Sequence, residues 1–154
     1  MTIGQHVPAP AQDVIVAALL HDAPEFAPTE TDIYQTLTAN YGSEVARIIA
    51  ALQAEHRALD EPSPPIRVDD ESVLLASTSD KIVALTSLLR RAQSTGNALT
   101  FFDRRPVLRG LLPHFRAFQR AAHPRVPASM SAHLDAALTP LERAAACAQG
   151  AGAR

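Results

Sequence analysis

The sequence predicts an all-α protein, and three observations support this prediction. Alanine and leucine dominate the composition, whereas β-branched and aromatic residues are sparse and only 6 of the 154 residues are glycine. This balance favours helices. Hydrophobic residues make up 47% of the chain, enough for a folded core. Several segments also space their apolar residues at helical intervals. The length fits one compact domain, which we place at residues 1–148, followed by a frayed tail at 149–154.

The first helix is expected at residues 11–21. Residues 1–9 contain glycine and proline and are predicted to be an irregular lead-in. The helix itself is apolar on nearly every face, which predicts a central helix that is covered on several sides. Pro24 and Pro28 then bracket a loop.

Two further helices are expected in the next segment. Thr31 or Asp32 can cap a short helix that ends at Tyr41 and Gly42, and Ser43 can cap the helix that follows. The second of these helices has a mostly clean apolar stripe with charged residues on the other side. The stripe consists of Val45, Ile48, Ile49, Leu52 and Leu59.

The rest of the chain is also expected to be helical apart from one loop. Residues 60–70 contain three prolines and predict a loop with a short strand-like piece at residues 66–68. Three more helices are expected at residues 71–92, after Pro106 and at residues 127–147. In the last of them, Pro140 is expected to kink or break the helix.

Composition and charge argue against several classes of function. The formal net charge of −2 leaves no basic footprint for nucleic acid. A single cysteine, Cys147, excludes an intramolecular disulfide and a cysteine-rich zinc site. The longest apolar run, residues 14–20, is too short to span a bilayer, and the N-terminus lacks the pattern of a signal peptide. We therefore expect a cytoplasmic protein without a membrane or nucleic-acid partner.

An adjacent His-Asp pair ends the first predicted helix. His21 and Asp22 follow its apolar run, and Glu25 comes three residues after Asp22. An imidazole and a carboxylate side by side can hold one divalent cation. Glu25 would then be placed to orient or deprotonate a water molecule beside that cation.

Asp80 is a second acidic candidate for the same site. It lies within the apolar helix predicted at residues 71–92, with apolar residues three, four and seven positions away, and so it is expected to face packed structure. Burying an unpaired carboxylate costs several kcal/mol, by order of magnitude, so Asp80 needs a partner. That partner is either Lys81 or an arginine in an ion pair, or a metal shared with His21 and Asp22. From the residues alone, the ion pair is favoured, because structural ion pairs outnumber metal sites.

Three segments of the chain together resemble the HD-domain metal-dependent phosphohydrolases. The resemblance is greatest to the RelA/SpoT-like and small alarmone hydrolases, which act on guanosine tetraphosphate. In that branch an apolar helix ends in the His-Asp pair, a second amphipathic helix follows, and a third helix supplies the last aspartate. The match covers roughly residues 11–92 in the same order. Its segments are residues 17–25 (AALLHDAPE), 41–52 (YGSEVARIIAAL) and 76–85 (ASTSDKIVAL).

The resemblance implies a compact HD-domain helical bundle with a metal centre. It implies that His21, Asp22 and Asp80 are metal ligands and that Glu25 is the catalytic carboxylate. The ion implied is divalent, with manganese favoured. The implied substrate is a small nucleotide-like phosphate ester, with guanosine tetraphosphate as the candidate from the most similar branch.

The sequence departs from this family in three places. The family has an earlier helix that carries the first metal-ligating histidine. We expect this helix to be missing here, and His6, in the lead-in, is not expected to replace its histidine. Phe26 stands where the alarmone hydrolases have aspartate, and Ala84 where they have asparagine. We therefore expect weak hydrolysis, and the alternative is a degenerate HD fold that binds a ligand or a protein. The apolar face left without its covering helix would allow a homodimer.

Other candidate residues are interpreted as structural. His56 lies at the end of the third predicted helix on its apolar side, and a packed or capping role is favoured over a ligand role. The basic pairs Arg90-Arg91 and Arg104-Arg105 could meet a phosphate, although basic residues near helix ends are ordinary.

Overall fold

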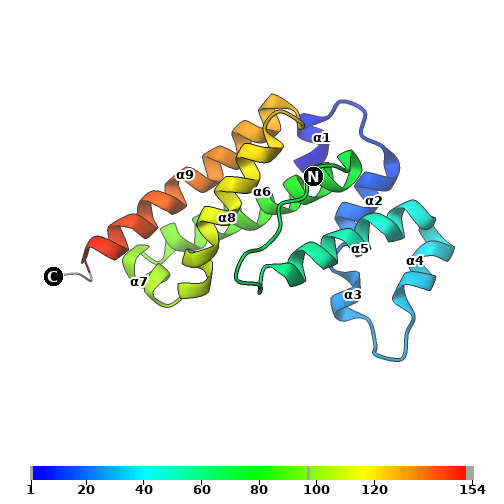
Figure 1. Cartoon of the computed structure of the whole chain (residues 1–154), viewed down its shortest axis with the longest axis horizontal. Coiled ribbons are helices and arrows are strands. Elements are labelled where there is room, and N and C mark those ends of the chain that lie inside the picture. Colours follow the sequence, from blue (N-terminus) through cyan, green and yellow to red (C-terminus); the bar gives the residue numbers. More distant parts are fainter. Residues whose placement is uncertain (1, 97, 152–154) are drawn as a thin grey trace. The chain divides into compact units, whose positions relative to one another are not determined.

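The computed structural model describes residues 2–96 and 98–151, and every regular element within these ranges is a helix (Figure 1). The all-α prediction is therefore confirmed. Contacts between Cα atoms divide the chain into two units, Met1–Asp80 and Lys81–Arg154. The boundary lies inside the long helix α6 (Glu71–Ser94). The expectation of one domain over residues 1–148 stays a prediction.

Helix α5 (Ser43–Ala58) is the central element of the first unit. It packs against both α2 (Gln12–Leu20) and α4 (Ile33–Tyr41). The one-turn helix α3 (Ala23–Phe26) contacts α4, and α1 (Thr2–His6) contributes a buried isoleucine. The aliphatic core of this unit consists of Ile3, Val14, Leu37, Val45, Ile48, Ile49, Leu52 and Leu74. Four of these side chains belong to the predicted stripe of α5, whose helical spacing places them on one face.

The turn between α4 and α5 depends on Gly42. Its φ of 92° lies in the left-handed region that side chains with a Cβ rarely adopt. Its N–H donates to the carbonyl of Thr38 at 3.0 Å and so closes α4. At the other end of α4, the Asp32 carboxylate accepts a hydrogen bond from the N–H of Gln35 at 3.0 Å. Capping by Asp32 is thus confirmed, whereas Gly42, and not Ser43, occupies the N-cap of α5.

The second unit contains the remainder of α6 and three more helices. Helices α7 (Ala98–Asp103), α8 (Pro106–Ala122) and α9 (Ala128–Ala151) all pack against one another. Their core is rich in large side chains: Phe101, Phe102, Leu112, Phe118, Met130, Leu134, Leu138 and Leu141.

Arg116 ties α8 to α9. Its Nη2 and Nε donate to the two carboxylate oxygens of Glu142 at 2.7 and 3.0 Å, and its Nη1 also pairs with Asp135. The hydrogen bonds from Glu142 and Asp135 raise the pKa of Arg116 above its usual range, despite partial burial. A two-pronged arginine–carboxylate contact fixes both distance and orientation between two helices.

Several local expectations are wrong in instructive ways. The lead-in contains α1, and the loop expected around Pro24 contains α3, because a proline in the first turn costs a helix no hydrogen bond. Residues 66–68 are not a strand. Helix α9 continues through Pro140, so the expected break is wrong, whereas the kink stays a prediction. The neighbouring Leu138 and Leu141 are fully buried. It also runs into the expected tail; residues 152–154 of that tail lie outside the described residues.

The expectation that the first long helix is covered on several sides is also wrong. Only Val14 and Ala17 of α2 are buried, and the side chain of Leu19 is 66% exposed. Four further apolar residues of α2 are half-buried: Ile15, Val16, Ala18 and Leu20. The uniform apolar composition of α2 therefore does not translate into uniform burial.

One helix of the described residues, α6, is long and apolar enough to cross a membrane by length and composition alone. A buried core helix meets the same criteria. Leu74, Ala76, Ile82 and Leu85 of α6 are all buried inside the protein, so this feature is a weak indication of a membrane span.

The difference between α5 and α2 can be tested with two matched substitutions. Leu52→Ala removes a side chain that is fully buried, and we expect the free energy of unfolding to fall by about 2–5 kcal/mol. Leu19→Ala truncates an exposed side chain and should change it by only about 0.5 kcal/mol. Urea unfolding of the two variants measures both values. Equal losses would show that α2 is as deeply packed as α5.

Candidate metal centre

His21 lies at the C-terminal end of α2, where it forms the C-cap of the helix. Its Nδ1 is 3.0 Å from the carbonyl oxygen of Ala18, one turn back along the helix. A carbonyl can only accept, so Nδ1 carries the proton and donates it. In the neutral ring the lone pair is then on Nε2. A backbone carbonyl that orients the ring in this way is typical of histidines that bind a metal through the other nitrogen.

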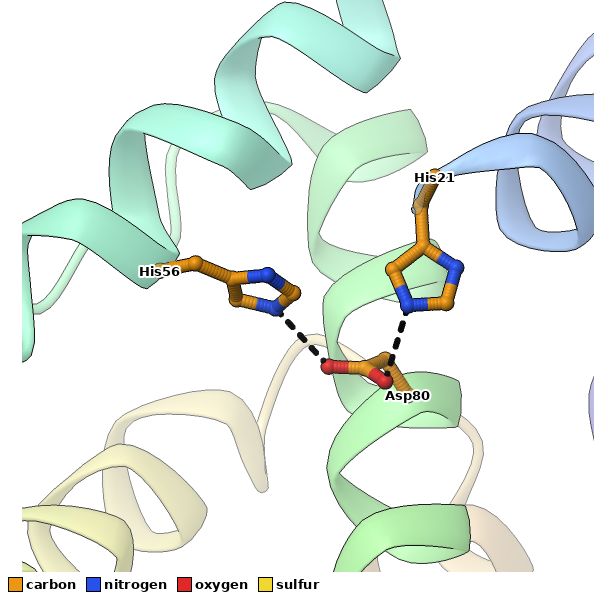
Figure 2. A group of neighbouring side chains, drawn as sticks. All are labelled: His21, His56 and Asp80. Atoms are coloured by element: carbon orange, nitrogen blue, oxygen red, sulfur yellow. Dashed lines mark hydrogen bonds and ion pairs between the residues drawn. The ribbon is translucent and has the colours of Figure 1, made fainter. Parts of the chain in front are cut away.

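Asp80 connects His21 to a second imidazole. One oxygen of its carboxylate is 3.2 Å from Nε2 of His21, and the other is 3.1 Å from Nε2 of His56. Figure 2 shows this carboxylate of α6 between a ring from the end of α2 and a ring from α5. The three side chains are 20%, 16% and 25% exposed, respectively, so the cluster is shielded but still reachable from solvent.

Asp22 adds a second carboxylate to the same ring nitrogen. One of its oxygens lies 3.1 Å from Nε2 of His21. Nε2 of His21 therefore faces oxygens of both Asp22 and Asp80. A lone pair that points at two carboxylates is repelled by both, so the arrangement requires a positive charge at Nε2. That charge is either a proton or a metal cation.

Without a metal, the proton takes this place. The hydrogen bond to Asp80 raises the pKa of the His21 imidazole to about 9, against the opposing effect of burial. Burial would raise the pKa of the Asp80 carboxyl, but the hydrogen bonds from His21 and His56 outweigh it and hold that pKa well below its usual range. In the absence of a cation the site is thus a strongly coupled carboxylate and imidazolium.

Gln53 joins this cluster to Glu25. Its side chain is 6% exposed, and its amide nitrogen donates to the carbonyl oxygen of His21 at 2.8 Å. The same nitrogen lies 3.4 Å from a carboxylate oxygen of Glu25 in α3. A buried amide that contacts both the His21 carbonyl and the Glu25 carboxylate limits the movement of both groups. Gln53 therefore positions the exposed Glu25 carboxylate beside the His-Asp pair.

The donor set fits a divalent metal. His21, His56 and Asp80 offer three ligand atoms within 4.8 Å of one another, and Asp22, Glu25 and His56 form a second such group. Metal–nitrogen and metal–oxygen bonds of about 2.0–2.2 Å place neighbouring ligands about 3–3.5 Å apart. The distances of 3.1 and 3.2 Å around Asp80 already match this spacing. Nitrogen and oxygen donors suit manganese, zinc or iron.

The structure brings together all four residues singled out from the sequence: His21, Asp22, Glu25 and Asp80. The inward orientation of Asp80 agrees with its helical position, although its partners are imidazoles and not Lys81. Whether these residues hold a metal stays a prediction. Among the described residues, neither group of candidate ligands includes His6.

His56 belongs to the cluster, although its position in the sequence favours a packed or capping role. Its Nε2 contacts Asp80 directly. The sequence does contain an indication that His56 points inward. His56 follows Gln53 by three residues and Leu52 by four, and so it shares the buried face of α5. What the sequence could not show was that α6 lies opposite this face. Ser77 of α6 confirms the pairing, since its hydroxyl donates to Glu55 of α5 at 2.7 Å.

No protein-family model, curated protein or solved structure matches this chain.

The raised pKa of His21 predicts how the stability of the metal-free protein depends on pH. The folded state holds the His21 proton with a pKa of about 9, compared with 6.5 for an ordinary histidine. This stabilisation is therefore complete below pH 6.5 and lost as the pH rises through 9. Urea unfolding at about pH 6 and about pH 9.5, in the presence of a chelator, measures the loss. His21→Gln lacks the titrating group and should lose less stability over this interval. An equal loss in both proteins would contradict the assignment.

Proposed function

We propose that this protein is a metal-dependent phosphohydrolase of the HD-domain type, acting on a nucleotide-like phosphate ester. The observation that supports the proposal is the placement of His21 Nε2 between Asp22 and Asp80, with His56 on the far oxygen of Asp80. A divalent cation at His21 Nε2 would supply the positive charge that this arrangement requires, and His21, Asp22 and Asp80 are the ligands that the family resemblance implies. Guanosine tetraphosphate is the candidate substrate from the same resemblance, and manganese is the candidate ion.

The ligands would come from three separate helical elements. His21 and Asp80 would bind the ion directly. Asp22, the residue after His21, would complete the ligand set. We add His56, which the resemblance does not imply, because it reaches the same carboxylate from α5. A divalent ion bound here would act as a Lewis acid toward a phosphoryl oxygen and lower the pKa of a water molecule.

Glu25 would serve as the general base. Its carboxylate is exposed, so a substrate and a water molecule can reach it, and Gln53 holds it near His21. Glu25 would take a proton from the attacking water as the water oxygen bonds to phosphorus. The ester oxygen would leave with the cleaved group and acquire a proton. A positioned base of this kind contributes about 10²–10⁴-fold to a rate.

A binding module without strong catalysis is the second candidate. Two substitutions favour it: Phe26 and Ala84 stand where the alarmone hydrolases have an acidic residue and an amide. The side chain of Phe26 is 82% exposed and offers no polar group to a substrate. In this case the same side chains would still bind a metal, but the phosphate ester would be held and not cleaved.

Metal binding is the first test. We expect Asp80→Asn to weaken manganese binding at least about tenfold, because it removes the charge that faces both imidazoles. His56→Gln should weaken it by a similar factor. Titration calorimetry with manganese chloride at neutral pH measures the affinities. Asp13→Asn is the matched control, since Asp13 is exposed on α2 and outside both groups of candidate ligands. Equal affinity in Asp80→Asn and the parent protein would make Asp80 a structural carboxylate.

Hydrolysis separates the two candidate functions. For a phosphohydrolase, Glu25→Gln should slow manganese-dependent release of pyrophosphate from guanosine tetraphosphate by about 10²-fold or more. Manganese affinity at the group formed by His21, His56 and Asp80 should change little, because these three residues remain. Phosphate-release kinetics at saturating manganese provide the measurement. A parent protein that binds manganese but releases nothing would favour the binding module, and an unaffected rate in Glu25→Gln would remove Glu25 from the mechanism.

A further inference from the structure

The second unit contains a cavity that the proposed function does not use. It has a volume of about 540 Å³ and lies where the end of α6, the helix α7 and the start of α8 meet. Its lining consists of Thr95, Thr100, Phe101, Arg104 and Arg105. The volume is within the range of about 300–1,000 Å³ that is typical of small-molecule sites. The two adjacent arginines give this cavity its chemical character.

Arg105 is held in place by the ring and the backbone of Phe101. Its guanidinium carbon lies 4.1 Å from the centre of the Phe101 ring, and its Nη1 donates to the carbonyl oxygen of Phe101 at 3.2 Å. Phe101 itself is 2% exposed and so provides a rigid support. A cation fixed in advance by stacking and a backbone contact loses less conformational entropy when it binds an anion.

The positive charge around this cavity has no counter-ion within the described residues. Neither Arg104 nor Arg105 pairs with a carboxylate there; the neighbouring Asp103 lies 3.9 Å from Arg109 instead. Arg105 is also the N-cap of α8, whose first turn contains no acidic residue. The partial positive charge at a helix N-terminus favours anions and disfavours cations. Two arginines at this position therefore repel each other and the helix end.

We infer that this cavity binds a phosphate-bearing anion. Such an anion would relieve the repulsion between Arg104, Arg105 and the N-terminus of α8. Guanidinium groups match phosphate oxygens with two parallel N–H donors. A phosphate group also carries more charge and more acceptor oxygens than a carboxylate, so it can face two arginines at once. The arginines would supply the hydrogen bonds, because the hydroxyl of Thr95 already donates to the carbonyl oxygen of Ala92 at 2.8 Å. This inference does not rest on the metal centre, since all the residues involved belong to the second unit.

Binding of inorganic pyrophosphate to the metal-stripped protein of residues 1–154 tests the inference. Titration calorimetry at about 50 mM ionic strength limits screening of the exposed arginines. We expect saturable binding by the parent protein, weakened at least tenfold in both Arg104→Gln and Arg105→Gln. Arg143→Gln is the matched control, because it removes the same charge from an exposed position of α9 outside the cavity, and it should bind as the parent does. Circular dichroism of each variant verifies the helical fold.

Two results would overturn the inference. One is the absence of saturable pyrophosphate binding to the parent protein. The other is equal weakening in all three variants, which would mean that the affinity for pyrophosphate depends only on the net charge of the protein. A parallel titration with guanosine diphosphate distinguishes the sources of the phosphate group: tighter binding than that of pyrophosphate assigns the cavity to a nucleotide, and equal binding assigns it to the phosphate alone. Because no metal is present, failure here leaves the proposed metal centre untouched.

Discussion

The carboxylate of Asp80 is the group on which the candidate site depends. Both of its oxygens are engaged, one by His21 and the other by His56, and these imidazoles come from different elements. A buried carboxylate with one imidazole would be an ordinary ion pair. Here Asp80 contacts two imidazoles, and Asp22 contacts the same nitrogen of His21 as Asp80 does. Two carboxylates and two imidazoles therefore lie close together. A proton on His21 satisfies these groups in the metal-free protein, and one divalent cation would satisfy them as well.

Helix α5 couples this site to the core of the first unit. The stripe residues that lie within α5 (Val45, Ile48, Ile49 and Leu52) are all buried. The same helix presents Gln53 and His56 close to them. Rotating or shifting α5 to accommodate a different core would therefore move both polar side chains. Packing against α2 and α4 thus fixes the distance between the two imidazoles as well as the stability of the unit. Sites built on rigid elements in this way hold their geometry better than sites on loops.

Much of this arrangement was predictable from the sequence, for identifiable reasons. Helical spacing predicted the buried part of the α5 stripe, because it depends only on neighbours along one helix. It also predicted the shielded position of Asp80, although Val83 on the same face of α6 is 55% exposed. The short helices α1 and α3 were missed, since four or five residues carry too little periodicity and Pro24 reads as a loop signal. The role of His56 depends on a contact across 24 residues of sequence, which no local pattern encodes. The exposure of Leu19 could not be predicted, because composition alone cannot tell which face of an apolar helix packs against another element.

The hydrogen bond between His56 and Asp80 joins residues that are 24 positions apart, and His21 comes from still earlier in the chain. In the unfolded polypeptide these donors are distant, so an ion that holds all three closes two loops at once. Such a crosslink lowers the conformational entropy of any state that retains it, much as a disulfide would. Because the chain has one cysteine and no such covalent link of its own, the availability of a divalent cation would set how firmly its first eighty residues stay folded.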